Sequence, residues 1–200
     1  MQLYVTMTSP YARLARVLVI EKALEDRVEI IAAKTRAPDS PYYKINPSGR
    51  VPYLIDDDGV GMEDSQLICA YLDSLDGKPR FHDPQSRSDW AYLRLEFMAR
   101  NMCEGVAVWT REMTRPEAER SPALLAHEQA RGRRMADVFE GHVAGPLLQG
   151  PPLMVHLILA AALDMAAKRG FGDLTVGRPQ LGAWQRAIST RPSLQRTALP

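Results

Sequence analysis

The chain has 200 residues, of which 46% are hydrophobic and 24% are charged, and this composition is typical of compact globular proteins. It carries 25 basic and 24 acidic side chains, so its formal net charge is +1. A protein that binds nucleic acid by neutralising phosphates needs a larger positive excess. We therefore expect no nucleic-acid partner.

Cysteine and histidine are too few and too scattered for a disulfide framework or a zinc site. The two cysteines, Cys69 and Cys103, belong to no C-x-x-C pattern. The N-terminal segment lacks the apolar run of a secretory signal, and the most apolar later stretch, 153–167, is shorter than the ~20 residues that span a bilayer. These features predict a cytoplasmic protein without a membrane partner.

The charge pattern divides the chain into two unlike halves. Residues 1–78 carry 9 basic and 12 acidic side chains, whereas residues 79–200 carry 16 basic and 12 acidic ones. A polar segment that contains prolines lies between them, at 76–86. The sequence thus predicts two domains, over residues 1–77 and 86–200.

The first half alternates between strand and helix patterns. The order is β-α-β, a loop rich in Pro, Asp and Ser, and then β-β-α with a glycine-supported hairpin turn. This order predicts a small open α/β sheet whose first crossover is right-handed. The predicted strands cover 2–6, 28–33, 51–55 and 60–63, and the predicted helices cover 10–24 and the apolar run that ends at 75.

The second half contains helix patterns only. Ser121-Pro122 is typical of an N-cap followed by a first-turn proline, and the stretch 153–168 is apolar on nearly every side. We expect that stretch to be the buried centre of a helical bundle. The predicted helices cover 87–113, 121–143 and 153–168, and two more begin near 178 and 191.

Ser9 is the first candidate for chemistry. Ser9-Pro10 starts a helix by local capping alone, and a purely structural cap is the simpler interpretation. The functional interpretation is that a hydroxyl at a helix N-terminus, just after the first strand, binds an anion. A bound thiolate would accept a hydrogen bond from Ser9, since neither cysteine of the chain lies there.

The segment Arg50-Val51-Pro52 is the second candidate. A proline that enters an inner strand removes a ladder donor and often marks a cis bond at a tight turn, whereas an edge strand with a trans proline is the alternative. With a cis bond, Val51 would present its main-chain N–H and C=O to an extended peptide. The segment therefore suggests a peptide-like ligand.

Asp64 and Ser65 are the third candidate, since they precede an apolar helical run. Each alone is best explained as an N-cap. Together they fit a zwitterionic amino-acid end, because Ser65 and the helix N–H groups would hold a carboxylate while Asp64 holds an ammonium.

These three segments, TSPYARLARV, NPSGRVPYL and EDSQLICAYLD, resemble in this order the N-terminal thioredoxin-like domain of the cytosolic glutathione transferase superfamily. The second half is similar to the all-helical domain of that family, in particular of bacterial serine-type members. The resemblance covers nearly the whole chain. It implies a thioredoxin-like α/β domain followed by an all-helical domain, with glutathione as co-substrate and no metal.

The resemblance also implies roles for individual residues. Ser9 would stabilise the glutathione thiolate, Val51 beside cis-Pro52 would pair with the cysteinyl part, and Asp64 with Ser65 would hold the γ-glutamyl end. Arg50 would line the same site. The resemblance further implies Lys34 as a ligand of the glycyl carboxylate, and an acceptor pocket between the domains lined by Tyr11, Trp109 and Met113.

The chain departs from the family pattern at the central helix of the second domain. A Ser or Thr and, three residues on, an Asp often cap that helix, whereas here Leu153 and His156 occupy these places. We expect His156 to be structural rather than catalytic because its neighbours are apolar. Asp64 also replaces the more common longer carboxylate.

Several functions are compatible with these residues. The resemblance favours a homodimeric glutathione transferase that adds the glutathione thiolate to a small hydrophobic electrophile. The alternatives are a glutathione-dependent isomerase, dehalogenase or ether-cleaving enzyme, and a glutathione-binding protein without turnover. A thiol reductase is disfavoured, because Ser9 stands where a redox protein would carry cysteine.

Overall fold

A computed structural model describes residues 1–83 and 89–200 of the chain. They form two compact units: Met1–His82 together with Pro192–Pro200, and Asp83–Arg191. The units differ from the expected domains of 1–77 and 86–200 chiefly at the C-terminus, where the last residues cluster with the first unit. The end of the expected connector, 84–86, lies outside the described residues.

The first unit contains a four-stranded mixed sheet in the order β2-β1-β3-β4. Strand β1 pairs parallel with β2 and antiparallel with β3, and β3 pairs antiparallel with β4. The predicted order of elements and the α/β class are confirmed. The strands are β1 (Gln2–Val5), β2 (Glu29–Ala32), β3 (Tyr53–Ile55) and β4 (Gly61–Glu63).

Strand β3 begins later than predicted. The sequence pattern predicts a strand from residue 51, but β3 starts at Tyr53. Proline has no N–H to donate to a strand ladder, which explains why Pro52 stays outside the strand.

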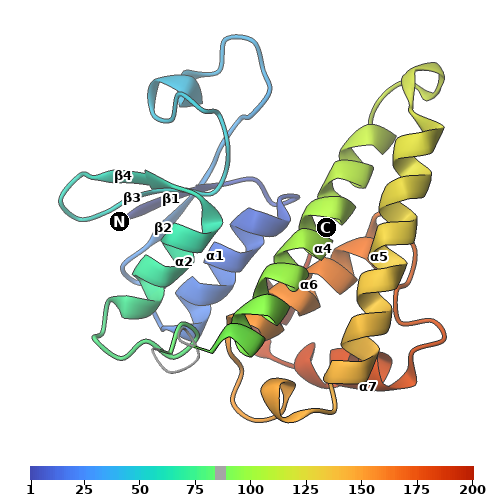
Figure 1. Ribbon diagram of the computed structural model, residues 1–200. Coiled ribbons are helices and arrows are strands. Elements are labelled where there is room, and N and C mark those ends of the chain that lie inside the picture. The colour runs from blue at the N-terminus through green and yellow to red at the C-terminus, as the bar shows by residue number, and fades with distance from the viewer. Residues whose placement is uncertain (84–88) are drawn as a thin grey trace. The chain divides into compact units, whose positions relative to one another are not determined.

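Two helices, α1 (Pro10–Glu21) and α2 (Ser65–Ser74), lie side by side on one face of the sheet (Figure 1). The segment that contains the short 3-10 helix η1 (Pro41–Lys44) extends from the other side. Apolar residues from the sheet and both helices form the core. The buried ones include Leu3, Val5, Leu54, Leu14, Leu18, Ile68 and Leu72.

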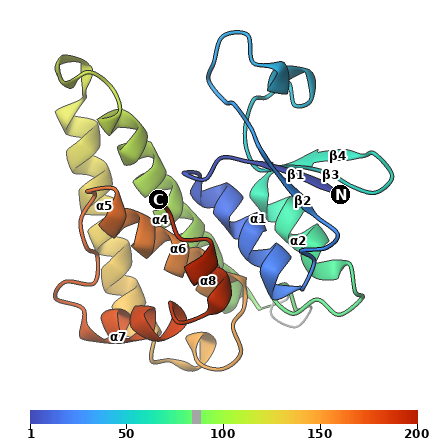
Figure 2. The same ribbon diagram turned by 180° about the vertical axis from the view of Figure 1, so that it is seen from behind.

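The short C-terminal helix α8 (Pro192–Arg196) packs against α1 within the first unit (Figure 2). The buried Arg13 side chain of α1 donates to the Leu194 carbonyl oxygen at 3.1 Å and to Thr197 Oγ1 at 3.5 Å. A buried guanidinium needs such acceptors, which ties the end of the chain to the first unit.

Among its described residues, the second unit contains helices and no strand, as predicted. Helix α4 packs against α5 and α6, and α7 packs against α5 and α6 (Figure 1). The helices are α4 (Trp90–Met113), α5 (Pro122–His142), α6 (Met154–Lys168) and α7 (Pro179–Ile188), with the 3-10 turns η2 (Glu117–Glu119) and η3 (Pro146–Leu148).

Helix α6 is the buried centre of the second unit, as its sequence predicts. Val155, Leu157, Ile158 and Leu159 are all fully buried. Over residues 1–83 and 89–200, no helix is both long enough and apolar enough to cross a bilayer.

Candidate functional site

Ser9 lies between β1 and α1 and is the N-cap of α1. Its Oγ accepts a hydrogen bond from the Ala12 N–H at 3.2 Å, and Pro10 occupies the first helical position. A serine hydroxyl has one proton and two acceptor lone pairs, so capping leaves the proton available for a ligand. The first turn of α1 contains no acidic side chain that would offset the positive end of the helix dipole. Ser9 is therefore able to cap the helix and to donate to an anion at the same time.

The Val51–Pro52 peptide bond is cis. Strand β3, which follows it, lies between β1 and β4, so the alternative of an edge strand with a trans proline does not apply. Among the described residues, none forms a hydrogen bond with the Val51 main chain. Its N–H and C=O remain available to an extended peptide.

Asp64 and Ser65 lie at the N-terminus of α2. Asp64 is the N-cap, and its Oδ1 accepts from the Gln66 N–H at 2.7 Å. Its φ of 76° is in the left-handed region, which non-glycine residues adopt rarely and often at binding sites. In the part of the chain that the structure describes, the hydroxyl of the largely buried Ser65 has no hydrogen-bond partner. Helix α2 thus presents a carboxylate, a hydroxyl and main-chain N–H groups at one end.

Comparison with known proteins matches this arrangement to one family. The family model for the glutathione S-transferase N-terminal domain matches residues 3–80. A glutathione transferase family member from Pseudomonas fluorescens Pf-5, solved with bound glutathione, is 28% identical, and the match covers 100% of this chain and 98% of that chain with a TM-score of 0.88. This chain belongs to the glutathione transferase superfamily. The resemblance expected from the three motifs is confirmed.

One further structure of the same Pseudomonas protein and one further relative extend the comparison. The same Pseudomonas protein was also solved with S-(propanoic acid)-glutathione, and that structure matches with a TM-score of 0.85 over 100% of both chains at 28% identity. The uncharacterized GST-like protein YibF of Escherichia coli K12 is 27% identical over 100% of this chain and 99% of its own length. The similarity to both proteins therefore extends over the full length of this chain.

The sequence analysis also predicted two basic residues, Lys34 and Arg50, at the glutathione site. Lys34 follows β2, and Arg50 precedes the cis bond. Both side chains are exposed, and neither forms an ion pair with another described residue. Both are free to meet a carboxylate from solvent.

The three residues expected to line an acceptor pocket belong to different units. Tyr11 is half-buried in α1 of the first unit. Trp109 is buried in α4 of the second unit, where its ring meets Phe171 edge-on with ring centroids 5.4 Å apart. Met113 is half-buried at the end of the same helix.

Sequence reasoning missed the side chains that hold the chain before the cis bond. Buried Tyr42 and Asn46 both donate to the Arg50 carbonyl oxygen. One local signal was present, because Ser40-Pro41 has the same cap-and-proline pattern as Ser9-Pro10 and starts η1. That signal places a helical turn but says nothing about its partner at Arg50.

Proposed function

We propose that this protein is a serine-type glutathione transferase that adds the glutathione thiolate to the electrophilic carbon of a small hydrophobic compound. The observation that carries the proposal is the Ser9 hydroxyl, whose proton is not used by the cap at the positive end of α1. The 28% identity to a full-length relative solved with glutathione supports the choice of ligand.

The proposed catalytic role of Ser9 is to stabilise negative charge on sulfur. Lowering a thiol pKa by two units from roughly 8.5 requires about 2.7 kcal/mol. A hydrogen bond to a charged group contributes ~1.5 to 3 kcal/mol, and a helix end ~0.3 to 1 kcal/mol. One hydroxyl and one helix end are therefore sufficient to keep bound glutathione ionised at neutral pH.

The rest of glutathione would lie along the first unit. The Val51 main chain would pair with the cysteinyl residue beside Pro52, while Asp64 and Ser65 hold the ammonium and carboxylate of the γ-glutamyl end. Arg50 and Lys34 would attract the remaining carboxylate. Binding of this kind brings nucleophile and electrophile together and lowers the entropic barrier of the reaction.

The electrophile would bind against Tyr11, which lies two residues after Ser9 and offers an aromatic ring. Trp109 and Met113 of the second unit are candidates that the resemblance implies. The Pseudomonas relative was solved with S-(propanoic acid)-glutathione, a thioether of glutathione. Such a thioether is the product that addition of the thiolate to carbon yields, and this favours transfer over thiol reduction. An isomerase, dehalogenase or ether-cleaving enzyme would use the same thiolate on a different acceptor.

Titration of bound glutathione tests the role of Ser9. Thiolate absorbance is followed against pH in the native protein and in Ser9→Ala, Ser9→Gly and Thr8→Ala. Alanine removes the cap and lowers stability by ~1 kcal/mol, whereas glycine costs only a few tenths, yet both remove the hydroxyl. We expect that in both Ser9 variants the thiol of bound glutathione ionises at a higher pH and turnover is lost, while the affinity for glutathione is kept.

Thr8→Ala is the matched control, because Thr8 is exposed and its hydroxyl has no hydrogen bond to another described residue. Native turnover in Ser9→Gly would refute the catalytic role. If the native protein binds glutathione but does not lower the pKa of its thiol, the protein is better explained as a glutathione-binding protein without turnover.

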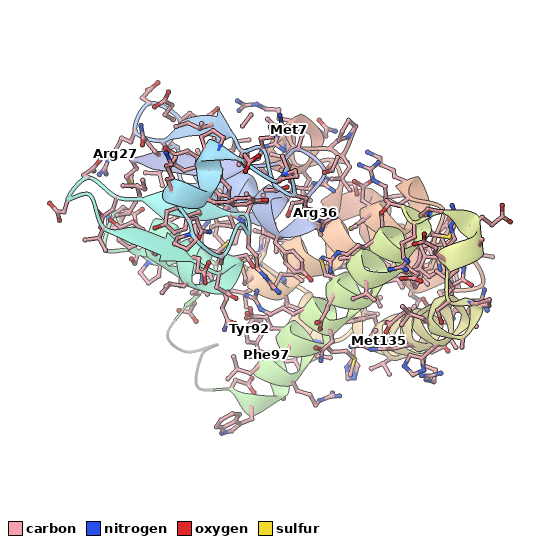
Figure 3. The ribbon with its side chains drawn as sticks, turned by 90° about the horizontal axis from the view of Figure 1, so that it is seen from above. Met7, Arg27, Arg36, Tyr92, Phe97 and Met135 are labelled. Atoms are coloured by element: carbon pink, nitrogen blue, oxygen red, sulfur yellow. The ribbon has the colours of Figure 1, made fainter. Side chains whose placement is uncertain are left out.

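We further propose that the protein is a cytoplasmic homodimer. A groove of about 490 Å³ runs along α4 and α5, and apolar Phe97, Met98, Met135 and Val138 contribute to its lining. Figure 3 labels Phe97 on α4 and Met135 on α5. Phe97 is 45% exposed, and exposed apolar side chains that line a groove in this way favour association with a second copy.

A further inference from the structure

Three side chains hold both main-chain groups of Arg50. Tyr42 Oη donates to the Arg50 carbonyl oxygen at 2.5 Å, and Asn46 Nδ2 donates to the same oxygen at 3.0 Å. Ser48 Oγ accepts from the Arg50 N–H at 3.2 Å. The contacts restrain the main chain of Arg50, whereas its charged side chain is exposed.

The restrained residue directly precedes the main chain that would bind the ligand. Tyr42 and Asn46 are each only 3% exposed, so their two donors converge on one carbonyl in a largely dry environment, where a hydrogen bond is stronger than in water. Val51, the next residue, has no main-chain hydrogen bond to another described residue. The contacts thus orient the Arg50–Val51 peptide and leave the Val51 groups open.

Further hydrogen bonds link Ser48 to the strand residue that precedes Asp64 and Ser65. Ser48 Oγ donates to Glu63 Oε2 at 2.5 Å, and Asn46 Oδ1 accepts from the Ser48 N–H at 3.1 Å. Glu63 is the last residue of β4 and directly precedes Asp64 and Ser65. The hydrogen bonds therefore connect the segment before the cis bond with the N-terminus of α2.

We propose that Tyr42, Asn46, Ser48 and Glu63, which we call the loop network, are positioning residues for glutathione. They hold Val51 in the orientation that pairs with the tripeptide backbone, and they set its distance from Asp64 and Ser65. This inference rests on the proposed binding of glutathione. The network acts on affinity, because none of its members forms a hydrogen bond with Ser9, the residue proposed to stabilise the thiolate.

The hydroxyl of Tyr42 is a dependable donor in this network. Burial raises its pKa above the ordinary value, and the hydrogen bond from Asn46 offsets this only in part. Tyr42 therefore keeps its proton at neutral pH and donates it to the Arg50 carbonyl oxygen.

The first test compares two tyrosines whose ring centroids lie 5.7 Å apart. Tyr42→Phe removes the donor to Arg50, whereas Tyr4→Phe removes a hydroxyl that donates to Gln2 at 3.2 Å. We expect Tyr42→Phe to raise the calorimetric Kd and the KM for glutathione about tenfold, which corresponds to ~1.4 kcal/mol. Turnover with saturating glutathione and an activated aryl chloride should fall less than about twofold.

The pH at which bound glutathione ionises should not change in Tyr42→Phe, because Ser9 is untouched. Tyr4→Phe should bind glutathione as the native protein does. A role that is only structural would lower the melting temperature of Tyr42→Phe but leave Kd unchanged well below that temperature.

The second test uses Ser48, which is exposed and whose replacement does not disturb the core. Ser48→Ala should weaken glutathione binding by about fivefold, and Ser48→Thr, which retains a hydroxyl, should restore it. If the native protein binds glutathione and both Tyr42→Phe and Ser48→Ala bind it equally well, the positioning role is refuted and the proposed function stands. If the native protein does not bind glutathione, the proposed function fails and this inference fails with it.

Discussion

The carboxylate of Asp73 joins the end of α2 to the segment that follows it. It is fully buried, and its oxygens accept from the N–H groups of Phe81 at 2.8 Å, His82 at 2.7 Å and Arg80 at 3.1 Å. Lys22 Nζ lies 3.4 Å from it. Although burial alone raises the pKa of Asp73, the hydrogen bonds from His82, Arg80 and Phe81 lower it well below its usual range.

Replacement of Asp73 by Asn should lower the free energy of unfolding by about 2 to 3 kcal/mol at neutral pH, because charge-assisted hydrogen bonds become neutral ones. A depressed carboxyl pKa stabilises the fold above the unfolded pKa of about 3.9, and this contribution is lost as the pH falls through the folded pKa. Urea unfolding should therefore show that the difference in unfolding free energy between the native protein and Asp73→Asn becomes smaller below about pH 4. Asp76→Asn is the control, since exposed Asp76 contacts the same Lys22 Nζ at 2.9 Å and should matter little. A gap that stays constant with pH would contradict this account.

Helix α6 begins without the usual capping side chain, because its N-cap residue Leu153 has no acceptor. Two other side chains accept hydrogen bonds from main-chain N–H groups at the start of α6. His156 Nδ1 accepts from the Leu153 N–H at 3.0 Å, and the Tyr92 hydroxyl of α4 accepts from the Val155 N–H at 3.4 Å. His156 Nε2 lies 3.3 Å from the Leu148 carbonyl oxygen, so the pattern assigns its proton to Nε2. These contacts agree with the structural role that the sequence predicts for His156.

Burial lowers the pKa of His156, and nearby Arg191 lowers it further, so the ring binds a proton at lower pH in the folded protein than in the unfolded chain. Between the unfolded pKa of about 6.5 and the lower folded pKa, the unfolded chain binds more protons, and stability falls as the pH falls, by up to ~1.4 kcal/mol per pH unit. His156→Gln keeps an acceptor for Leu153 and a donor for Leu148 but does not titrate. Denaturant unfolding between pH 7 and 5 should therefore show a smaller stability loss in His156→Gln than in the native protein. Equal losses would mean that other groups cause the acid sensitivity.

At the scale of the whole molecule, the proposed dimer is tested through the groove on α4 and α5. Three arginines line it beside the apolar residues: Arg94, Arg131 and Arg134. Because a two-fold interface repeats each residue, Phe97→Lys adds one more positive charge from each copy and should produce monomers. Trp90→Lys is the control, since Trp90 is 83% exposed but does not line the groove.

Sedimentation at micromolar concentration should give twice the chain mass for the native protein and Trp90→Lys, and the chain mass for Phe97→Lys. A monomeric native protein would contradict the proposed dimer. A dimeric Phe97→Lys would show that another surface is used.

The sequence by itself determined the strands and α-helices and their order, together with the residues that start α1, α2 and α5. Ser9, Asp64 and Ser121 are recognisable because a cap and its target N–H lie within one helical turn, so local spacing predicts the contact. The apolar periodicity of α6 likewise predicted its burial, because a helix without a polar face must lie inside a bundle.

Only the tertiary structure decided which distant groups satisfy the buried polar atoms. Arg13 bonds to Leu194, Asp73 to the segment 80–82, and Tyr42 to Arg50. Such partners share no periodic spacing, and each pair forms because a polar group removed from water must find an acceptor or donor where the folded chain brings one. For this reason the sequence located Ser9 and Val51 but not the loop network that holds Val51 in place.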